Sequence, residues 1–162
     1  ATTPAGLFIT AIDTQPLALD PAAVIAENPE AFMLGQDILA QLVDCPVYLC
    51  CEAGTEIPRG EHSRIERADF SGPHPAGLVG THIHYLLGAS LSTLAWHVGY
   101  QDVIAIGRLV MDGELYTDRI ISLAGPQVSS PRSVRTRVGA DLQELTAGQL
   151  ADGETRAFAR HG

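Results

Sequence analysis

The sequence predicts an α/β protein with a parallel sheet and helices on both faces, followed by the beginning of a smaller second unit. Short, nearly continuous apolar runs, typical of strands buried on both faces, alternate with stretches whose apolar residues recur at helical spacing. After residue 118 the pattern changes to two strands joined by a short loop and followed by a helix, which is how a β-grasp unit begins. We therefore expect an α/β domain over residues 1–118 and the N-terminal part of a β-grasp domain over residues 119–162.

The strands of the first unit are predicted from their apolar runs. In chain order they are Gly6–Ile12, Pro46–Cys51, Arg64–Phe70 and Leu94–Val98. The third strand has mixed polarity, so we expect it at an edge of the sheet. Alternation along the fourth strand places Trp96 and His97 on opposite faces.

Capping residues predict where the helices begin. Asp20 with Pro21, and Asn28 with Pro29, each place a capping side chain before a proline at the first helical position. The helix after Asn28 should run to about Val43, because its apolar residues keep a 3.6-residue period up to that point.

Two further helices are expected in the first unit. The first runs from near Thr81 to Gly88. The second follows Gly99 and ends at Asp112 and Gly113. Its predicted buried positions are Val103, Ile106, Val110 and Met111.

The second unit is predicted to begin with the strands Arg119–Ala124 and Ser133–Val138. A short helix follows, with Asp141 and Glu144 spaced as in a capping box and with Gly148 at its end. The remaining strands of a β-grasp unit would lie beyond residue 162, so we expect this unit to be truncated.

The stretch Ser71–Leu86 (SGPHPAGLVGTHIHYL) has the most unusual composition in the chain. Pro73–Pro75 is expected to be extended, because proline fixes φ and lacks an N–H donor. Gly77 and Gly80 permit close backbone approaches, and Thr81 can cap the helix that follows. A glycine turn before a helix can hold an anion, but a tight turn without a ligand explains the same residues.

The histidines of this stretch do not match a helical metal site. His82 and His84 are two residues apart, so on a helix they point in very different directions. Zinc-binding pairs on a helix are one turn apart, as in HExxH. We therefore predict no metal site.

Two other groups of residues are candidates for contacts. The polar and aromatic residues Trp96, His97, Tyr100 and Gln101 follow a strand, where α/β proteins place ligand contacts. They can equally be a core tryptophan followed by helix-capping residues. A basic stripe either docks a partner or only solvates the surface, and its residues are Arg132, Arg135 and Arg137.

Composition excludes several classes of protein. The net charge is −9 and every basic residue is arginine, which argues against nucleic-acid binding and against attraction to an anionic membrane. The three cysteines, Cys45, Cys50 and Cys51, do not form a disulfide framework and are expected to be buried and reduced. No apolar run is long enough to span a bilayer, and a start without Met suggests a fragment of a longer protein.

Motifs for catalysis and nucleotide binding are missing. The sequence contains no GxSxG, no CxxC and no GxxxxGK[ST]. The loop after the first strand reads DTQPLALD, so it offers the carboxylate of Asp13 but no glycine cradle for a dinucleotide. From the residues alone, we expect an α/β domain without catalytic residues of its own.

Several strings resemble a known family, the NqrA subunits of the bacterial sodium-translocating NADH:quinone oxidoreductase. They are FITAIDTQPLALDP (Phe8–Pro21), GPHPAGLVGTHIHYL (Gly72–Leu86), WHVGYQDVIAIGRL (Trp96–Leu109) and RIISLAGPQVSSPRSVRTRVGADLQELTAG (Arg119–Gly148). The resemblance extends over nearly the whole chain, and THIHYL and WHVGYQDV are specific to it.

The resemblance implies a soluble subunit on the cytoplasmic side of the bacterial inner membrane, attached to membrane-embedded partners. The complex oxidises NADH, reduces ubiquinone and exports sodium, using flavins and iron–sulfur centres in its other subunits. Related subunits of respiratory complex I and the Rnf complex join a Rossmann-like domain to a β-grasp domain of the soluble-ligand-binding (SLBB) type. Their glycine-rich flavin loop and cysteine cluster are absent here, so we expect no cofactor in this chain.

The resemblance also implies a link to quinone binding. The residues that suit a quinone headgroup, through stacking or an imidazole donor, are His74, Gly77, His82, His84, Trp96 and His97. The alternative is a structural module that braces neighbouring subunits, for which Arg132, Arg135 and Arg137 are the docking candidates.

Overall fold

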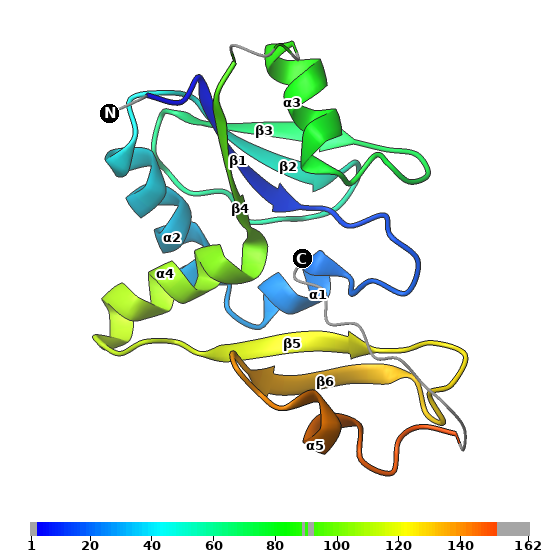
Figure 1. Cartoon of the computed structure of the whole chain (residues 1–162). Coiled ribbons are helices and arrows are strands. Elements are labelled where there is room, and N and C mark those ends of the chain that lie inside the picture. The colour runs from blue at the N-terminus through cyan, green and yellow to red at the C-terminus, as the bar shows by residue number, and fades with distance from the viewer. Residues whose placement is uncertain (1–2, 89, 91–92, 152–162) are drawn as a thin grey trace.

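A parallel four-stranded sheet forms the centre of the structure, a computed structural model that describes residues 3–88, 90 and 93–151. Its strand order is β3-β2-β1-β4 (Figure 1). The strands are β1 (Gly6–Ala11), β2 (Val47–Glu52), β3 (Ile65–Phe70) and β4 (Ala95–Gly99). The helices of this part are α1 (Pro21–Ala26), α2 (Pro29–Leu42), α3 (Val79–Leu87) and α4 (Tyr100–Asp112). The predicted α/β class is confirmed, and β3 is the edge strand that its polarity predicted.

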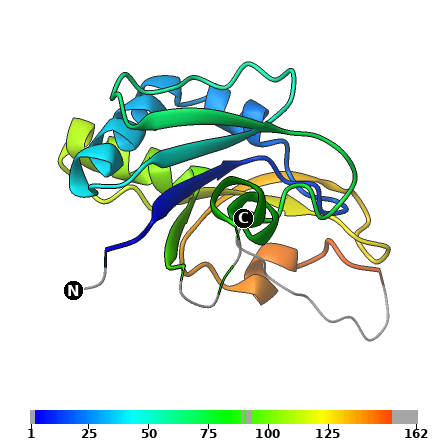
Figure 2. The same cartoon turned by 90° about the horizontal axis from the view of Figure 1, so that it is seen from above.

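Helices cover both faces of this sheet. In Figure 1 α3 lies at the upper right of the sheet, whereas α2 lies to its left and α1 and α4 lie below it. Leu7 and Ile9 of β1 belong to the main apolar core beneath the sheet, and Phe8, which is also fully buried, points to the opposite face. A side chain added at Gly6 would meet Tyr48 and Leu87, which places α3 on the face of Phe8. Figure 2 shows the same layers from above.

The two long helices α2 and α4 cross with their backbones unusually close together. A Cβ atom added to Gly35 of α2 would lie 2.1 Å from the carbonyl oxygen of Val103. A Cβ added to Gly107 of α4 would lie 1.9 Å from the carbonyl oxygen of Ala31. Both distances are far below van der Waals contact, so this crossing requires glycine on both helices.

A second, two-stranded sheet follows the α/β part. Strand β5 (Asp118–Leu123) pairs antiparallel with β6 (Arg132–Arg137), and the short helix α5 (Leu142–Thr146) comes next. Asp141 caps α5 by accepting hydrogen bonds from the backbone N–H groups of Gln143 and Glu144. In Figure 1 the hairpin lies below α1 and α4. The expected order of strand, strand and helix is confirmed.

Gln101 attaches the hairpin to α4. Its side-chain amide donates to the carbonyl of Ile120 at 2.8 Å, and the N–H of Ile120 donates back to its amide oxygen at 2.9 Å. The backbone groups of Ile120 therefore point away from β6, and Gln101 pairs with the outer edge of β5 as a neighbouring strand would. The side chain of Ile120 packs against the main core.

Two expectations about the segment before α3 were wrong. Pro73–Pro75 is a turn, not an extended segment: the His74–Pro75 peptide is cis, and the N–H of Ala76 donates to the carbonyl of Pro73. The φ angle of proline suits a turn as well as an extended chain, so composition did not separate the two. Thr81 does not cap α3, which begins at Val79; its hydroxyl donates to the carbonyl of Pro75 instead.

The predicted apolar face of α4 was correct at Val103 and wrong at Val110 and Met111. Its buried residues are Tyr100, Val103, Ile104 and Gly107, whereas Val110 and Met111 are exposed. The contact with α2 is made through backbone at Gly107, and a pattern of large apolar residues gives no weight to a glycine. The helix does end at Gly113, which is in the left-handed conformation as expected.

Within the described part of the chain, every helix is too short or too polar to cross a membrane.

Replacing either crossing glycine should destabilise the fold. We expect Gly35→Ala and Gly107→Ala each to lower the free energy of unfolding by about 1–3 kcal/mol or more, because backbone cannot move aside as a flexible side chain can. The measurement is urea unfolding followed by circular dichroism. Gly80→Ala in α3 is the matched control, since nothing lies within 4 Å of its added Cβ and helix propensity favours alanine by roughly 0.5–1 kcal/mol. Equal losses in all three variants would contradict the close crossing.

Candidate functional site

Four of the six quinone candidates lie on the side of the sheet that α3 covers. His74 and Gly77 are in the turn before α3, His82 is in α3 itself, and His97 is in β4. Because β4 neighbours β1, these four residues surround the carboxyl-terminal half of β1 and the loop that follows it.

The turn before α3 is fixed to the loop after β1. The N–H of Gly77 donates to the hydroxyl of Thr14 at 2.9 Å, and Nδ1 of His74 lies 3.3 Å from the same oxygen. A Cβ on Gly77 would lie 2.6 Å from the backbone nitrogen of Thr14, so only glycine fits this position. The neighbouring Asp13 uses its carboxylate locally, accepting from the N–H of Gln15 at 2.9 Å. The strand order reverses between β1 and β4, and this turn therefore covers the crevice in which open α/β sheets usually bind ligands.

His82 is the fully buried residue of α3 and points toward the sheet. Its Nε2 donates to the carbonyl of Ala76 at 2.8 Å, and its ring packs on Phe70 with centroids 4.2 Å apart. A carbonyl can only accept, so the proton lies on Nε2 and Nδ1 has no partner among the described residues. Burial lowers the pKa of His82, opposed by the bond to Ala76 and aided by nearby His97.

His97 lies beside β1 on the same face. Its Nε2 is 2.9 Å from the hydroxyl of Thr10. The residue is exposed at the edge of the sheet, yet partial burial of the ring lowers its pKa, while Asp102 acts in the opposite direction. The register pairs Phe8 with His97, so the ring belongs to the face that α3 covers.

The other two candidates point elsewhere. His84 is exposed on α3 and makes an edge contact with the ring of Tyr85. Trp96 pairs with Leu7 and therefore points to the face of α2 and α4, away from His97. The alternation predicted for this strand is thus correct, and it separates Trp96 from the histidines.

The candidate residues in β4 and at the start of α4 form no common site. Trp96 is 47% exposed and is not a core residue, whereas Tyr100 is buried against the main core. Gln101 is used to hold β5. No local pattern in the sequence indicates this contact, because the partner Ile120 is 19 residues further along the chain.

The arginine stripe is divided between the two faces of the hairpin. Arg135 points toward α1 and forms an ion pair with Glu27. Arg132 lies on the opposite face and donates to Gln149 at 2.8 Å. Arg137 shares the face of Arg135 and has no ion pair among the described residues.

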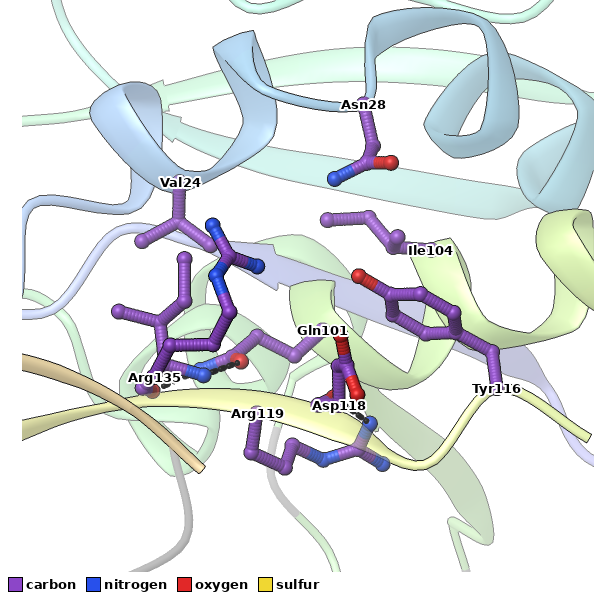
Figure 3. Close-up of a pocket in the computed structure, with 9 residues that line it drawn as sticks. Val24, Asn28, Gln101, Ile104, Tyr116, Asp118, Arg119 and Arg135 are labelled. Atoms are coloured by element: carbon purple, nitrogen blue, oxygen red, sulfur yellow. Dashed lines mark hydrogen bonds between the residues drawn. The ribbon is translucent and has the colours of Figure 1, made fainter. Parts of the chain in front are cut away.

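A small cavity lies within the contact between the hairpin and the helices. Figure 3 shows it between α1, α4 and β5, with Arg135 extending from β6 toward α1 and the ring of Tyr116 at the other end. Its volume of about 10 Å³ is only enough for about one water molecule. This contact is therefore packing between elements, not a ligand site.

The cysteines do not supply a nucleophile. Burial raises the pKa of Cys50 to about 12 and that of Cys51 to about 11, so both thiols stay protonated near neutral pH. Among the described residues, no group of three histidine, cysteine or acidic side chains is placed to hold a metal ion.

Burial of His82 should make stability depend on pH. Its folded-state pKa is lowered, so the unfolded chain binds the proton more tightly and stability falls as pH drops below about 6.5, the ordinary histidine pKa. Between about pH 7.5 and about pH 5.5, His82→Gln should lose less unfolding free energy than the unmodified chain. Urea unfolding at both pH values measures this difference. His84→Gln, which removes an exposed imidazole two residues away, should keep the original pH dependence, and identical curves for both variants would contradict the assignment.

Comparisons with known proteins identify relatives over nearly the whole chain. A family model described as "NqrA second alpha/beta domain" matches residues 1–115, and one described as "NQRA C-terminal domain" matches residues 120–158. The NqrA subunit of the Na(+)-translocating NADH-quinone reductase of Yersinia pestis bv. Antiqua is 55% identical over 156 residues, which are 96% of this chain and 35% of that protein.

Two further relatives with the same name agree. The protein from Photorhabdus laumondii is 52% identical over 96% of this chain, and the protein from Vibrio alginolyticus is 51% identical over 94%. The chain spans about a third of the length of these curated relatives. Because the first family model covers well over half of its residues, this chain belongs to the NqrA family of subunits of the Na(+)-translocating NADH-quinone reductase.

Proposed function

We propose that this chain is the α/β and β-grasp part of a subunit of a sodium-pumping NADH:ubiquinone oxidoreductase. It carries no redox centre of its own, sits at the cytoplasmic surface of the membrane, and contributes histidines to a quinone site. The names and identities of the relatives support membership of such a complex. We also propose that residues 1–118 and 119–162 are its two domains.

The contacts around Thr14 argue against a dinucleotide in the usual crevice. In nucleotide-binding α/β folds, the loop after the first strand supplies glycines whose N–H groups hold phosphate. Here the corresponding loop contains no glycine, and the turn at Gly77 lies directly against it. NADH and flavin would then be bound by other subunits.

The grouping of His82 and His97 on one face is the observation that carries the quinone proposal. If the hydroxyl of Thr10 donates to Nε2 of His97, the ring proton is on Nδ1 and remains available to a quinone carbonyl. His82 is near enough to His97 for the two rings to interact electrostatically, and its lowered pKa favours the neutral imidazole on this face. His97 is exposed, and its ring is on the face of the sheet that α3 covers, so a headgroup can reach it from that face.

A binding experiment tests the quinone site. A short-chain ubiquinone analogue added to the full-length protein should bind, and His97→Phe should weaken binding about tenfold, the usual effect of losing one hydrogen bond. Equilibrium dialysis measures the dissociation constants. His62→Phe is the control, because His62 lies in the loop before β3 and outside this face. Equal affinity in the unmodified protein and in His97→Phe would remove His97 from the site.

The alternative function is a docking module that uses the arginine face of the hairpin. Arg137 favours it, since this side chain is exposed and has no ion pair among the described residues. Arg137→Glu in the full-length protein should then reduce recovery of the other subunits when the complex is purified through a tag. Arg132→Glu, on the opposite face of β6, controls for the change in net charge. Unchanged recovery in both variants would exclude docking through this face.

A further inference from the structure

The segment Ser71–Gln101, which contains α3 and β4, is neutral in an otherwise acidic protein. All 19 acidic and all 10 basic residues of the chain lie outside it. Four of the six histidines lie inside it. Surfaces without charge are unusual on a protein of net charge −9, because charged side chains keep such proteins soluble and separate.

Large apolar side chains are exposed on this neutral segment. Tyr85 of α3 is 73% exposed, and Trp96 of β4 is 47% exposed. Leu94, directly before β4, is 41% exposed. Depletion of charge together with exposed aromatic residues is the composition found at the centre of protein–protein interfaces.

The strand that carries Trp96 also has an unpaired edge. In the described residues β4 pairs with β1 alone, at the end of the order β3-β2-β1-β4. The N–H of Leu7 donates to Pro46, so odd-numbered residues of β1 direct their backbone groups to β2 and even-numbered residues direct theirs to β4. The register with β1 then directs the backbone groups of Trp96 toward β1 and those of Ala95 and His97 outward.

We propose that an extended, uncharged segment from a neighbouring subunit pairs with the open edge of β4 as an added strand and covers Trp96. This inference rests on the proposed function, because it assigns to the edge another member of the same complex. Backbone groups of the added strand would pair with those of Ala95 and His97, and apolar side chains would contact Leu94 and Trp96.

Other occupants fit the edge less well. Two copies of this chain would bring together two net charges of −9, which repel each other. A lipid surface provides no row of backbone groups to pair with Ala95 and His97. A polypeptide strand without charged residues satisfies both the hydrogen-bonding groups and the neutral surface.

Amide hydrogen exchange distinguishes the edge from the interior of the sheet. In the isolated full-length subunit, the amides of Ala95 and His97 should exchange rapidly, whereas those of Trp96 and Val98, which face β1, should be protected. In the purified complex, exchange at Ala95 and His97 should slow by about tenfold or more. Slow exchange already in the isolated subunit would assign the edge to the subunit's own chain and overturn the proposal. Slowing by lipid vesicles alone would also overturn it.

A charged substitution provides the second test. Trp96→Lys in the tagged full-length subunit should reduce recovery of the complex by about tenfold or more, because a lysine on an edge strand opposes strand addition. Met111→Lys is the matched control: Met111 is 45% exposed, close to the 47% of Trp96, but lies at the end of α4 outside the neutral segment. Thermal unfolding of both variants verifies that they fold.

The outcomes separate this inference from the proposed function. If the unmodified subunit does not purify with any other subunit, the proposed function is wrong. If it does, and Trp96→Lys is recovered as well as Met111→Lys, the edge is not the docking site and only this inference fails.

Discussion

The crossing of α2 and α4 at Gly35 and Gly107 is the constraint on which the rest of the structure depends. Backbone atoms meet there without intervening side chains, so the two helices have one relative position at this point. The position of α4 in turn fixes Gln101 at its first turn, and Gln101 fixes the edge of β5. One backbone contact therefore determines where the second sheet lies relative to the first.

The two faces of the parallel sheet have different chemistry although both are covered by helices. The face toward α2 and α4 is packed with apolar residues alone along β1 and β2. The face toward α3 contains the polar groups of Thr10 and His97, and the buried imidazole of His82. Among the described residues the buried Nδ1 of His82 has no hydrogen-bond partner, and a nitrogen left in that state costs about 1–3 kcal/mol. Buried polar groups that lower stability cluster at functional sites, so the α3 face is the better place to look for a function.

Local signals in the sequence were sufficient for most elements and insufficient for contacts between them. Strands β1 and β2 and the cap of α1 at Asp20 follow from neighbouring residues, and the structure has them as predicted. The buried face of α4 includes Gly107. The need for glycine there is apparent only once α2 is packed against α4. The turn at Gly77 and the pairing of Gln101 with Ile120 join residues far apart in sequence, so no periodicity or capping rule indicates them. For the candidate site, alternation along β4 already separated Trp96 from His97, but the strand register and the packing of α3 were needed to show that His97 and His82 lie on the same side of the sheet.

The attachment of the hairpin determines how the two parts of the chain can act together. The ion pairs Arg135–Glu27 and Arg119–Asp102 are partly exposed to solvent, and surface pairs of this kind contribute only ~0–1 kcal/mol each. The paired hydrogen bonds of Gln101, with Ile120 packed against the main core and a cavity of only about 10 Å³ beside it, form the more specific contact. Gln101, which attaches β5 to α4, is only two residues beyond the end of β4. A partner strand bound to β4 would therefore lie close to the attachment point of the second sheet. In the proposed docking, backbone pairing at β4 and contacts of the hairpin would together fix the relative positions of neighbouring subunits.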